Sequence, residues 1–109
     1  MVEYALTLDT IFSSLADATR RDILQRVSQC ELTVSEVAKP YDMSLAAISK
    51  HLKILEQAKL IIKRKQGKQH FVQASPLAFK DALNYLEYYQ KLWDERFDAL
   101  ETFLSNEEG

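Results

Sequence analysis

The sequence has few of the residues that build disulfides, thiolate metal sites and phosphate-binding loops. Among 109 residues there are one cysteine, two glycines and two histidines. A single cysteine, Cys30, excludes an intrachain disulfide and a site made of several thiolates from one chain. Two glycines are too few for a glycine-rich phosphate loop, and no Ser/His/acid or Cys/His set has supporting context for nucleophilic catalysis. We therefore expect no enzymatic activity, no cofactor and no metal site.

Long apolar runs are also missing. No segment approaches the roughly 20 apolar residues that cross a bilayer. The first ten residues, MVEYALTLDT, lack the basic block followed by an apolar block that marks a secretion signal. The composition, 47% hydrophobic and 28% charged, is typical of a globular domain. We expect one domain over residues 1–109, no contact with membranes and a cytoplasmic location.

Positive charge is concentrated in one part of a chain whose net charge is −2. From Ser44 to Ala74 there are seven cations and one acid, whereas residues 1–43 have a net charge of −3 and residues 75–109 one of −5. A basic block within an acidic chain is the electrostatic pattern of a surface that binds a polyanion.

The centre of this block is the segment Ser44–Ala58, SLAAISKHLKILEQA. Four apolar residues share one face of a helix: Leu45, Ile48, Leu52 and Leu55. The opposite face has small and cationic residues: Ala46, Lys50, Lys53 and Gln57. Such a face suits the major groove of DNA. By itself the pattern also fits an ordinary solvated helix, so the neighbouring segments decide between the two interpretations.

The segments before and after this helix favour DNA binding. Thr33 and Glu36 form a capping-box pattern for a short helix over residues 34–39, Pro40 ends that helix, and Ser44 caps the next one. These features predict a helix-turn-helix over residues 33–58. Residues 60–65 and 68–74 then read as two strands joined by a turn at Gln66–Gly67.

This hairpin, residues 60–74, has a strongly cationic tip formed by Lys63, Arg64, Lys65 and Lys68. We interpret it as a wing that contacts DNA beside the helix. The alternative is a charged edge that protects an exposed strand from aggregation.

The flanking segments predict three further helices. Residues 4–16 form a short amphipathic helix, and Asp17 caps a second one over residues 18–29, where Arg20 and Arg21 either contact phosphate or form ion pairs with Asp17 and Asp22. Residues 75–104 contain a last helix of roughly 28 residues, about 42 Å long, which is longer than the core of so small a domain needs. We expect a homodimer through the first and last helices. The expected interface residues are Leu8, Ile11, Phe12, Leu86, Tyr89, Trp93, Phe97 and Leu100.

These elements give a mainly α fold with a small β-hairpin in the order α-α-α-α-β-β-α, a winged helix-turn-helix. Three segments resemble the ArsR/SmtB-type repressors, a family of arsenic- and metal-responsive regulators: FSSLADATRRDIL (12–24), LTVSEVA (32–38) and SLAAISKHLKILEQAKLIIKRKQGKQHF (44–71). The resemblance covers roughly residues 10–104. It implies a dimeric, DNA-binding transcriptional repressor that acts at a pseudo-palindromic operator.

The sequence departs from that family in two ways. Glycine is common where Lys59 stands, at the end of the helix, so lysine there is either strained or the helix ends differently. The metal ligands are also missing, because Thr33–Val34–Ser35 replaces a Cys-x-Cys and no histidine follows His70. Cys30, His51 and His70 share no common face. We therefore do not extend metal sensing to this chain.

The expected DNA contacts fall into three groups. Base edges would be contacted by Ala46, Ala47, Ser49 and Lys50. Phosphates would be contacted by Ser44, His51 and Lys53, although His51 fits equally well as a helix-packing residue. The wing would contribute Arg64, Lys65 and Lys68. Two alternative functions keep the same fold. One is a sensor, triggered at Cys30 or by an apolar ligand beside Tyr85, Tyr88, Tyr89 and Trp93. The other is a winged helix that binds only proteins. The sequence names no inducer.

Overall fold

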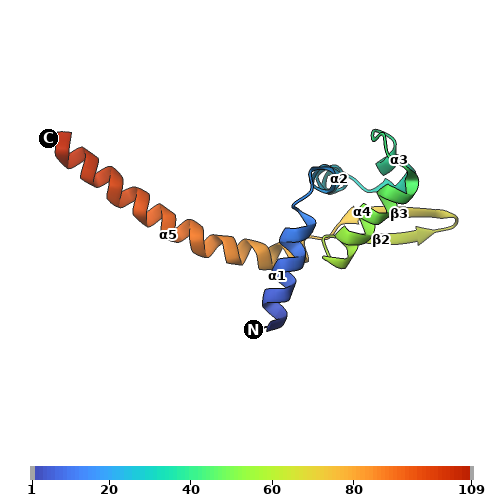
Figure 1. Ribbon diagram of the computed structural model, residues 1–109, viewed down its shortest axis with the longest axis horizontal. Coiled ribbons are helices and arrows are strands. Elements are labelled where there is room, and N and C mark those ends of the chain that lie inside the picture. The colour runs from blue at the N-terminus through green and yellow to red at the C-terminus, as the bar shows by residue number, and fades with distance from the viewer. Residues whose placement is uncertain (1, 109) are drawn as a thin grey trace.

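The computed structural model describes residues 2–108. Its elements, in chain order, are α1 (Val2–Ser14), α2 (Ala18–Gln29), β1 (Leu32–Thr33), α3 (Val34–Ala38), α4 (Leu45–Gln57), β2 (Ile61–Gln66), β3 (Gln69–Ala74) and α5 (Leu77–Glu108). Helices α1 to α4 and the sheet form a small body, from which α5 projects (Figure 1). No helix in this range is long and apolar enough to cross a membrane.

Three helices begin at the capping residues that the sequence predicts. The Asp17 carboxylate accepts a hydrogen bond from the Arg20 N–H at 3.0 Å, and the Ser44 hydroxyl accepts one from the Ala47 N–H at 3.1 Å. Thr33 and Glu36 form a complete capping box, in which each side chain accepts from the other residue's backbone N–H. These bonds satisfy donors that the first turn of a helix leaves unpaired.

The end of α4 resolves the question raised by Lys59. Its backbone lies in the left-handed region with φ 61°. The Lys59 N–H donates to Glu56 O and the Leu60 N–H to Leu55 O, which is the pair of bonds that defines a Schellman motif. The helix therefore ends as a glycine would end it, and lysine bears the strain of a conformation that glycine adopts freely.

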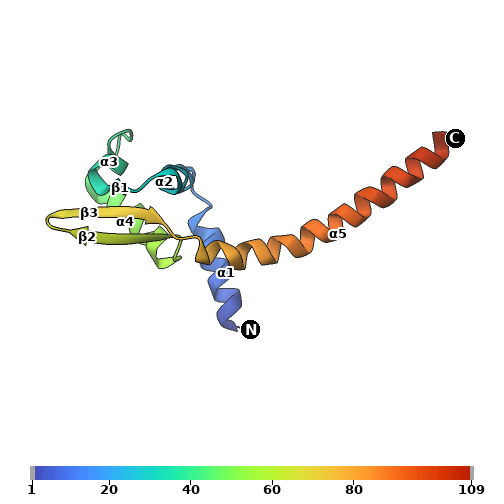
Figure 2. The same cartoon turned by 180° about the vertical axis from the view of Figure 1, so that it is seen from behind.

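The sheet has three antiparallel strands in the order β1-β3-β2, one strand more than the predicted hairpin. Leu32 pairs with Val72 and Thr33 with Phe71, so these two residues form an edge strand that the sequence analysis does not predict. The hairpin turn contains Gly67, whose φ of 63° suits glycine. At the base of the hairpin the Ser75 N–H donates to Leu60 O at 2.9 Å. Figure 2 shows β2 and β3 side by side, with this base next to the start of α5.

The core lies between the four body helices and the sheet. It includes Ile23 of α2, Val37 of α3, Leu52 of α4 and Val72 of β3. Ile11 also belongs to it.

Two residues of α1 correct the sequence prediction of the dimer interface. Ile11 is fully buried and Leu8 is 8% exposed. Both were expected to contact a second subunit, but residues of the same chain already cover their side chains. Phe12, on the adjacent face of α1, is 36% exposed.

Helix α5 has 32 residues and continues past the predicted end at residue 104. Most of it has no neighbour, so the molecule measures 69 × 34 × 20 Å and its radius of gyration is 19.2 Å. A compact chain of this length would have a radius of gyration of about 13 Å. The large side chains on the projecting part are exposed, including Trp93 at 50% and Phe97 at 60%.

Candidate DNA-binding surface

The outer face of α4 is open to solvent, as the sequence predicts. Ser44, Ala46, Ser49, Lys50 and Lys53 are exposed, whereas Ala47 is partly buried. Within residues 2–108 neither Lys50 nor Lys53 has a carboxylate within ion-pair distance. Both ammonium groups are therefore available to an external anion.

Leu45, the first residue of α4, differs from the prediction. It was expected on the buried face with Ile48, Leu52 and Leu55, which are buried, but it is 60% exposed. The first turn of α4 extends beyond the core. The side chain of Leu45 therefore stays exposed although it shares the helix face of the buried residues. Leu45 therefore joins the exposed surface, although sequence reasoning did not select it; its position directly after the Ser44 cap was the available signal.

His51 lies on α4 and contacts Arg20 in the first turn of α2. It is partly buried, and its Nδ1 is 3.3 Å from Nη1 of Arg20. In the free protein it is therefore a helix-packing residue, one of the two interpretations that the sequence leaves open.

Arg20 and Arg21 contact backbone carbonyl groups. Arg20 donates to Ser14 O at 2.7 Å and to Ser13 O at 3.2 Å, and Arg21 donates to Leu15 O at 2.9 Å. No ion pair of these arginines with Asp17 or Asp22 is present in the described part of the chain. The predicted ion-pair network is therefore replaced by capping of the C-terminus of α1, where a cation is favoured by the helix dipole.

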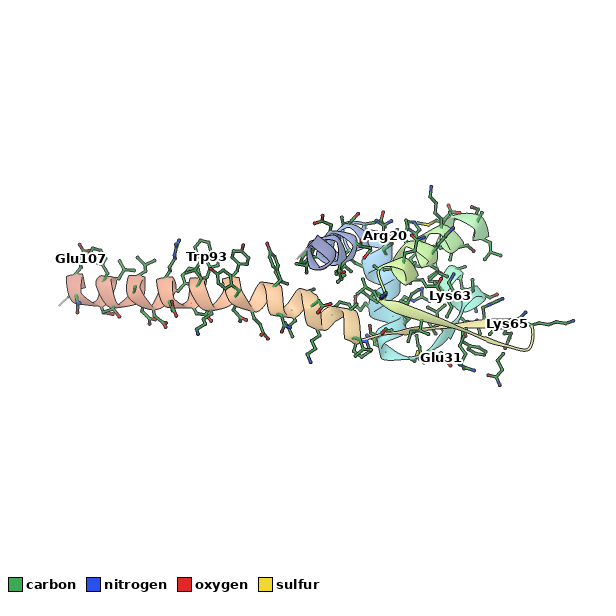
Figure 3. The ribbon with its side chains drawn as sticks, turned by 90° about the horizontal axis from the view of Figure 1, so that it is seen from below. Arg20, Glu31, Lys63, Lys65, Trp93 and Glu107 are labelled. Carbon is green, nitrogen blue, oxygen red and sulfur yellow. The ribbon has the colours of Figure 1, made fainter. Side chains whose placement is uncertain are left out.

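The wing presents its cations in two ways. Lys65 and Lys68 lie at the tip, exposed and without an ion pair among residues 2–108, and Figure 3 shows Lys65 at the far end of the hairpin. Lys63 pairs with Glu56 of α4 at 3.8 Å, which links the wing to the helix.

Arg64 is restrained by its neighbours in the wing. Its guanidinium donates to Glu31 Oε1 and to Gln66 Oε1, both at 2.7 Å, and lies 4.8 Å from the centre of the Phe71 ring. The structure therefore places this predicted DNA contact beside a carboxylate. A ligand must displace Glu31 or share Arg64 with it.

The turn between α3 and α4 is held by a polar cluster. The Tyr41 hydroxyl donates to the Asp22 carboxylate. Arg26 donates to Glu36 O and Val37 O, both at 2.9 Å, and its guanidinium stacks on the Tyr41 ring at 5.4 Å. Burial, together with the bond to Asp22, raises the pKa of Tyr41. This cluster connects α2 to α3 and to the turn that leads into α4.

The described residues contain no group of three His, Cys, Asp or Glu side chains that could hold a metal ion. Cys30 is exposed at the C-terminal end of α2. The three candidate soft ligands of the chain lie on separate elements: Cys30 after α2, His51 on α4 and His70 on β3.

Known proteins share both the sequence pattern and the structure. A family described as a helix-turn-helix domain matches residues 15–64. The chain is 38% identical over 68 residues to the HTH-type transcriptional regulator Rv2034 of Mycobacterium tuberculosis, a match that covers 62% of this chain and 64% of that protein. It is 30% identical over 79 residues to an arsenical resistance operon repressor of Staphylococcus aureus, with 72% of this chain and 76% of the relative covered. The crystal structure of an ArsR family transcriptional regulator superimposes with a TM-score of 0.77 at 39% identity and covers 83% of this chain and 93% of that one.

A helix-turn-helix whose second helix exposes a cationic face, followed by a β-hairpin with a basic tip, defines the winged helix-turn-helix class. Within that class the chain belongs to the ArsR family of transcriptional regulators. The family resemblance noted from the sequence is thus confirmed, and so is the fold class, with β1 added to the sheet.

Proposed function

We propose that this protein is a homodimeric, sequence-specific DNA-binding regulator that represses transcription at a pseudo-palindromic operator. The observation that carries the proposal is a set of four exposed lysines without ion pairs in the described chain: Lys50 and Lys53 on α4, and Lys65 and Lys68 on the wing. Four free cations on adjacent elements would raise the local concentration of a polyanion and release its counterions on binding.

The exposed face of α4 supports sequence reading in a major groove. Ala46, Ala47, Ser49 and Lys50 would approach base edges, where a lysine can donate to guanine O6 and N7 and an alanine methyl can pack on the thymine methyl. Leu45 adds a larger apolar contact of the same kind, since it is exposed beside Ala46. Ser44, His51 and Lys53 would lie near phosphates.

The proposed dimer rests on the uncovered apolar face of α5. Phe79, Ala82, Leu86 and Tyr89 continue into Trp93, Phe97, Leu100 and Leu104 at helical spacing. Ala82 is buried against the body and Phe79 is partly buried, but the side chains from Leu86 onward are 41–60% exposed. The same stripe that packs on the body therefore continues with side chains that the described part of the chain leaves exposed, and a second copy of α5 has the matching surface.

A groove beside α1 extends this surface. Phe12, Leu15, Phe79, Leu83 and Leu86 line an apolar hollow of about 500 Å³ between α1 and α5. Phe12 and Tyr85 stack at 5.9 Å between ring centres. The groove is continuous with the α5 stripe, so one isologous contact would cover both and set the two α4 helices about 34 Å apart, in successive major grooves.

The DNA-binding part is tested by selection. Wild-type protein is incubated with a random pool of duplexes of about 30 base pairs, which span nearly three helical turns. We expect enrichment of an inverted repeat with half-sites one turn apart, and repression of a reporter that carries it. A pool without enrichment, together with a stable complex with another protein, would instead favour the protein-binding alternative.

The dimer part is tested by a charge on the α5 stripe. Trp93→Glu should convert the dimer into a monomer in sedimentation equilibrium, because it places a carboxylate where about 100 Å² of aromatic surface per subunit would be buried, worth about 2.5 kcal/mol. Glu95→Lys, which changes charge on the opposite face of the same helix, is the matched control and should stay dimeric. A monomeric wild-type protein would refute this part of the proposal.

A further inference from the structure

One arginine connects the end of α1 to α4, the helix proposed to face DNA. Arg20 lies in the first turn of α2, and Figure 3 labels it near the point where the body helices meet. Its Nε donates to Ser14 O at 2.7 Å and its Nη2 to Ser13 O at 3.2 Å, at the C-terminus of α1. Its Nη1 lies 3.3 Å from Nδ1 of His51 on α4.

The chemistry of this last contact fixes the state of the imidazole. A guanidinium can only donate hydrogen bonds, so Nδ1 of His51 must be the acceptor. A neutral imidazole that accepts at Nδ1 carries its proton on Nε2. The contact with Arg20 therefore leaves His51 with one remaining donor, the Nε2–H, which is the group that a phosphate oxygen would need.

All three nitrogens of the Arg20 guanidinium are already used inside the protein. The Arg20 side chain is partly buried, and its backbone N–H also donates to the Asp17 carboxylate at 3.0 Å. The Arg20 backbone N–H holds the pKa of the Asp17 carboxylate below its ordinary value, and the Arg20 charge lowers this pKa further. Three of the five guanidinium N–H groups of Arg20 therefore have partners inside the free protein.

We propose that Arg20 is a positioning residue for DNA recognition. It fixes α4 against the end of α1 and holds the proton of His51 on Nε2, so that dimer geometry and the DNA-facing helix move as one unit. The inference rests on the proposed DNA-binding function and adds to it a residue that lies outside the binding surface.

Binding is measured by fluorescence anisotropy on the duplex that wild-type protein selects from the random pool. Arg20→Lys keeps the charge but loses the planar fork, and Arg20→Ala loses both. Both variants should weaken binding about tenfold, the effect of one charge-assisted hydrogen bond. Arg21→Ala is the matched control. Arg21 also donates to a carbonyl at the end of α1, but the contact with His51 of α4 belongs to Arg20. The Arg21→Ala variant should therefore bind DNA like the wild-type protein.

A double-mutant cycle separates positioning from other roles. If Arg20 acts through His51, the double variant Arg20→Ala/His51→Ala should bind no more weakly than His51→Ala alone. Additive losses would overturn the proposal. The proposal would also be overturned if Arg20→Ala made the slope of log affinity against log salt concentration shallower by about 1.8. A change of that size corresponds to one lost phosphate contact per subunit of a dimer.

A spectroscopic measurement on the wild-type protein does not depend on whether a variant folds. Nitrogen-15 NMR of the imidazole at mildly alkaline pH should show the proton of His51 on Nε2, and Arg20→Lys should shift the ring toward the other tautomer. A proton on Nδ1 in the wild-type protein would overturn the proposal. If the wild type selects no duplex, the proposed DNA-binding function itself fails, a result that is distinguishable from wild-type binding by both Arg20 variants.

Discussion

Neutralising the lysines at the wing tip should change how strongly DNA binding depends on salt. Lys65 and Lys68 are exposed at the end of the hairpin and have no ion pair in the described chain. Lys65→Gln and Lys68→Gln each remove one cation per subunit without removing buried surface. We therefore expect folded, dimeric variants with fewer phosphate contacts.

The magnitude follows from counterion release. Lys53, Lys65 and Lys68 are the free lysines that would face phosphates, so a dimer makes about six such contacts and the slope of log affinity against log salt concentration is about −5.4. Each single variant should have a slope of about −3.6, and the double variant one of about −1.8. Between 50 and 200 mM salt, the wild-type protein should lose about 10³-fold in affinity and the double variant about tenfold.

The assay is an anisotropy titration on the selected duplex at several salt concentrations. Lys91→Gln is the control: it removes an exposed lysine from α5, on the side of the helix opposite the apolar stripe, and should leave the slope unchanged. Equal slopes for Lys68→Gln and wild type would refute the role of the wing. If Lys91→Gln makes the salt dependence of the affinity as shallow as Lys68→Gln does, net charge and not the position of the lysine governs binding.

Three further predictions test other features. Glu31→Gln should raise DNA affinity about threefold at constant salt, because it releases Arg64 from an exposed ion pair of modest strength; unchanged or weaker binding would mean that Glu31 holds Arg64 ready for DNA. Lys59→Gly should stabilise the fold by about 1 kcal/mol and raise Tm by about 4 °C in a calorimetric scan, since φ is 61° there, whereas Lys59→Ala should give no such gain. Asp17→Asn should reduce the loss of unfolding free energy, measured by urea titration, as the pH is lowered into the acidic range. The Arg20 backbone N–H holds the pKa of Asp17 below its ordinary 3.8, so wild-type stabilisation is complete above 3.8 and is lost as pH falls through the lower folded pKa; an acid limb as steep as that of the wild type would contradict this.

Local features of the fold could be predicted from the sequence because their causes are local. A cap and the backbone N–H that it accepts are three residues apart, so Asp17, Thr33 and Ser44 identified three helix starts. The spacing of Ile48, Leu52 and Leu55 identified the buried face of α4 for the same reason.

Features that depend on distant residues escaped prediction. Strand β1 has two residues, too few to show alternation, and it forms because β3 lies beside it. The partner of Arg64 is 33 residues away and that of Arg20 is 31 residues away, so neither contact leaves a pattern in the sequence. Leu8 and Ile11 failed for a related reason: periodicity shows that a helix face is apolar, but not whether the same chain or another one covers it.

Under the proposed dimeric DNA binding, the short connection at the base of the wing would restrict the spacing of the two operator half-sites. Only Ser75 and Pro76 separate β3 from α5, and the Ser75 N–H is bonded to Leu60 O beyond the end of α4. A connection of two residues, one of them proline, adds little length between the wing and α5. One base pair inserted at the centre of an operator rotates one half-site by about 34° and moves it by about 3.4 Å. A dimer of the proposed kind, with its two α4 helices at a fixed separation, would follow that change only if the DNA twisted or one of the two contacts was lost.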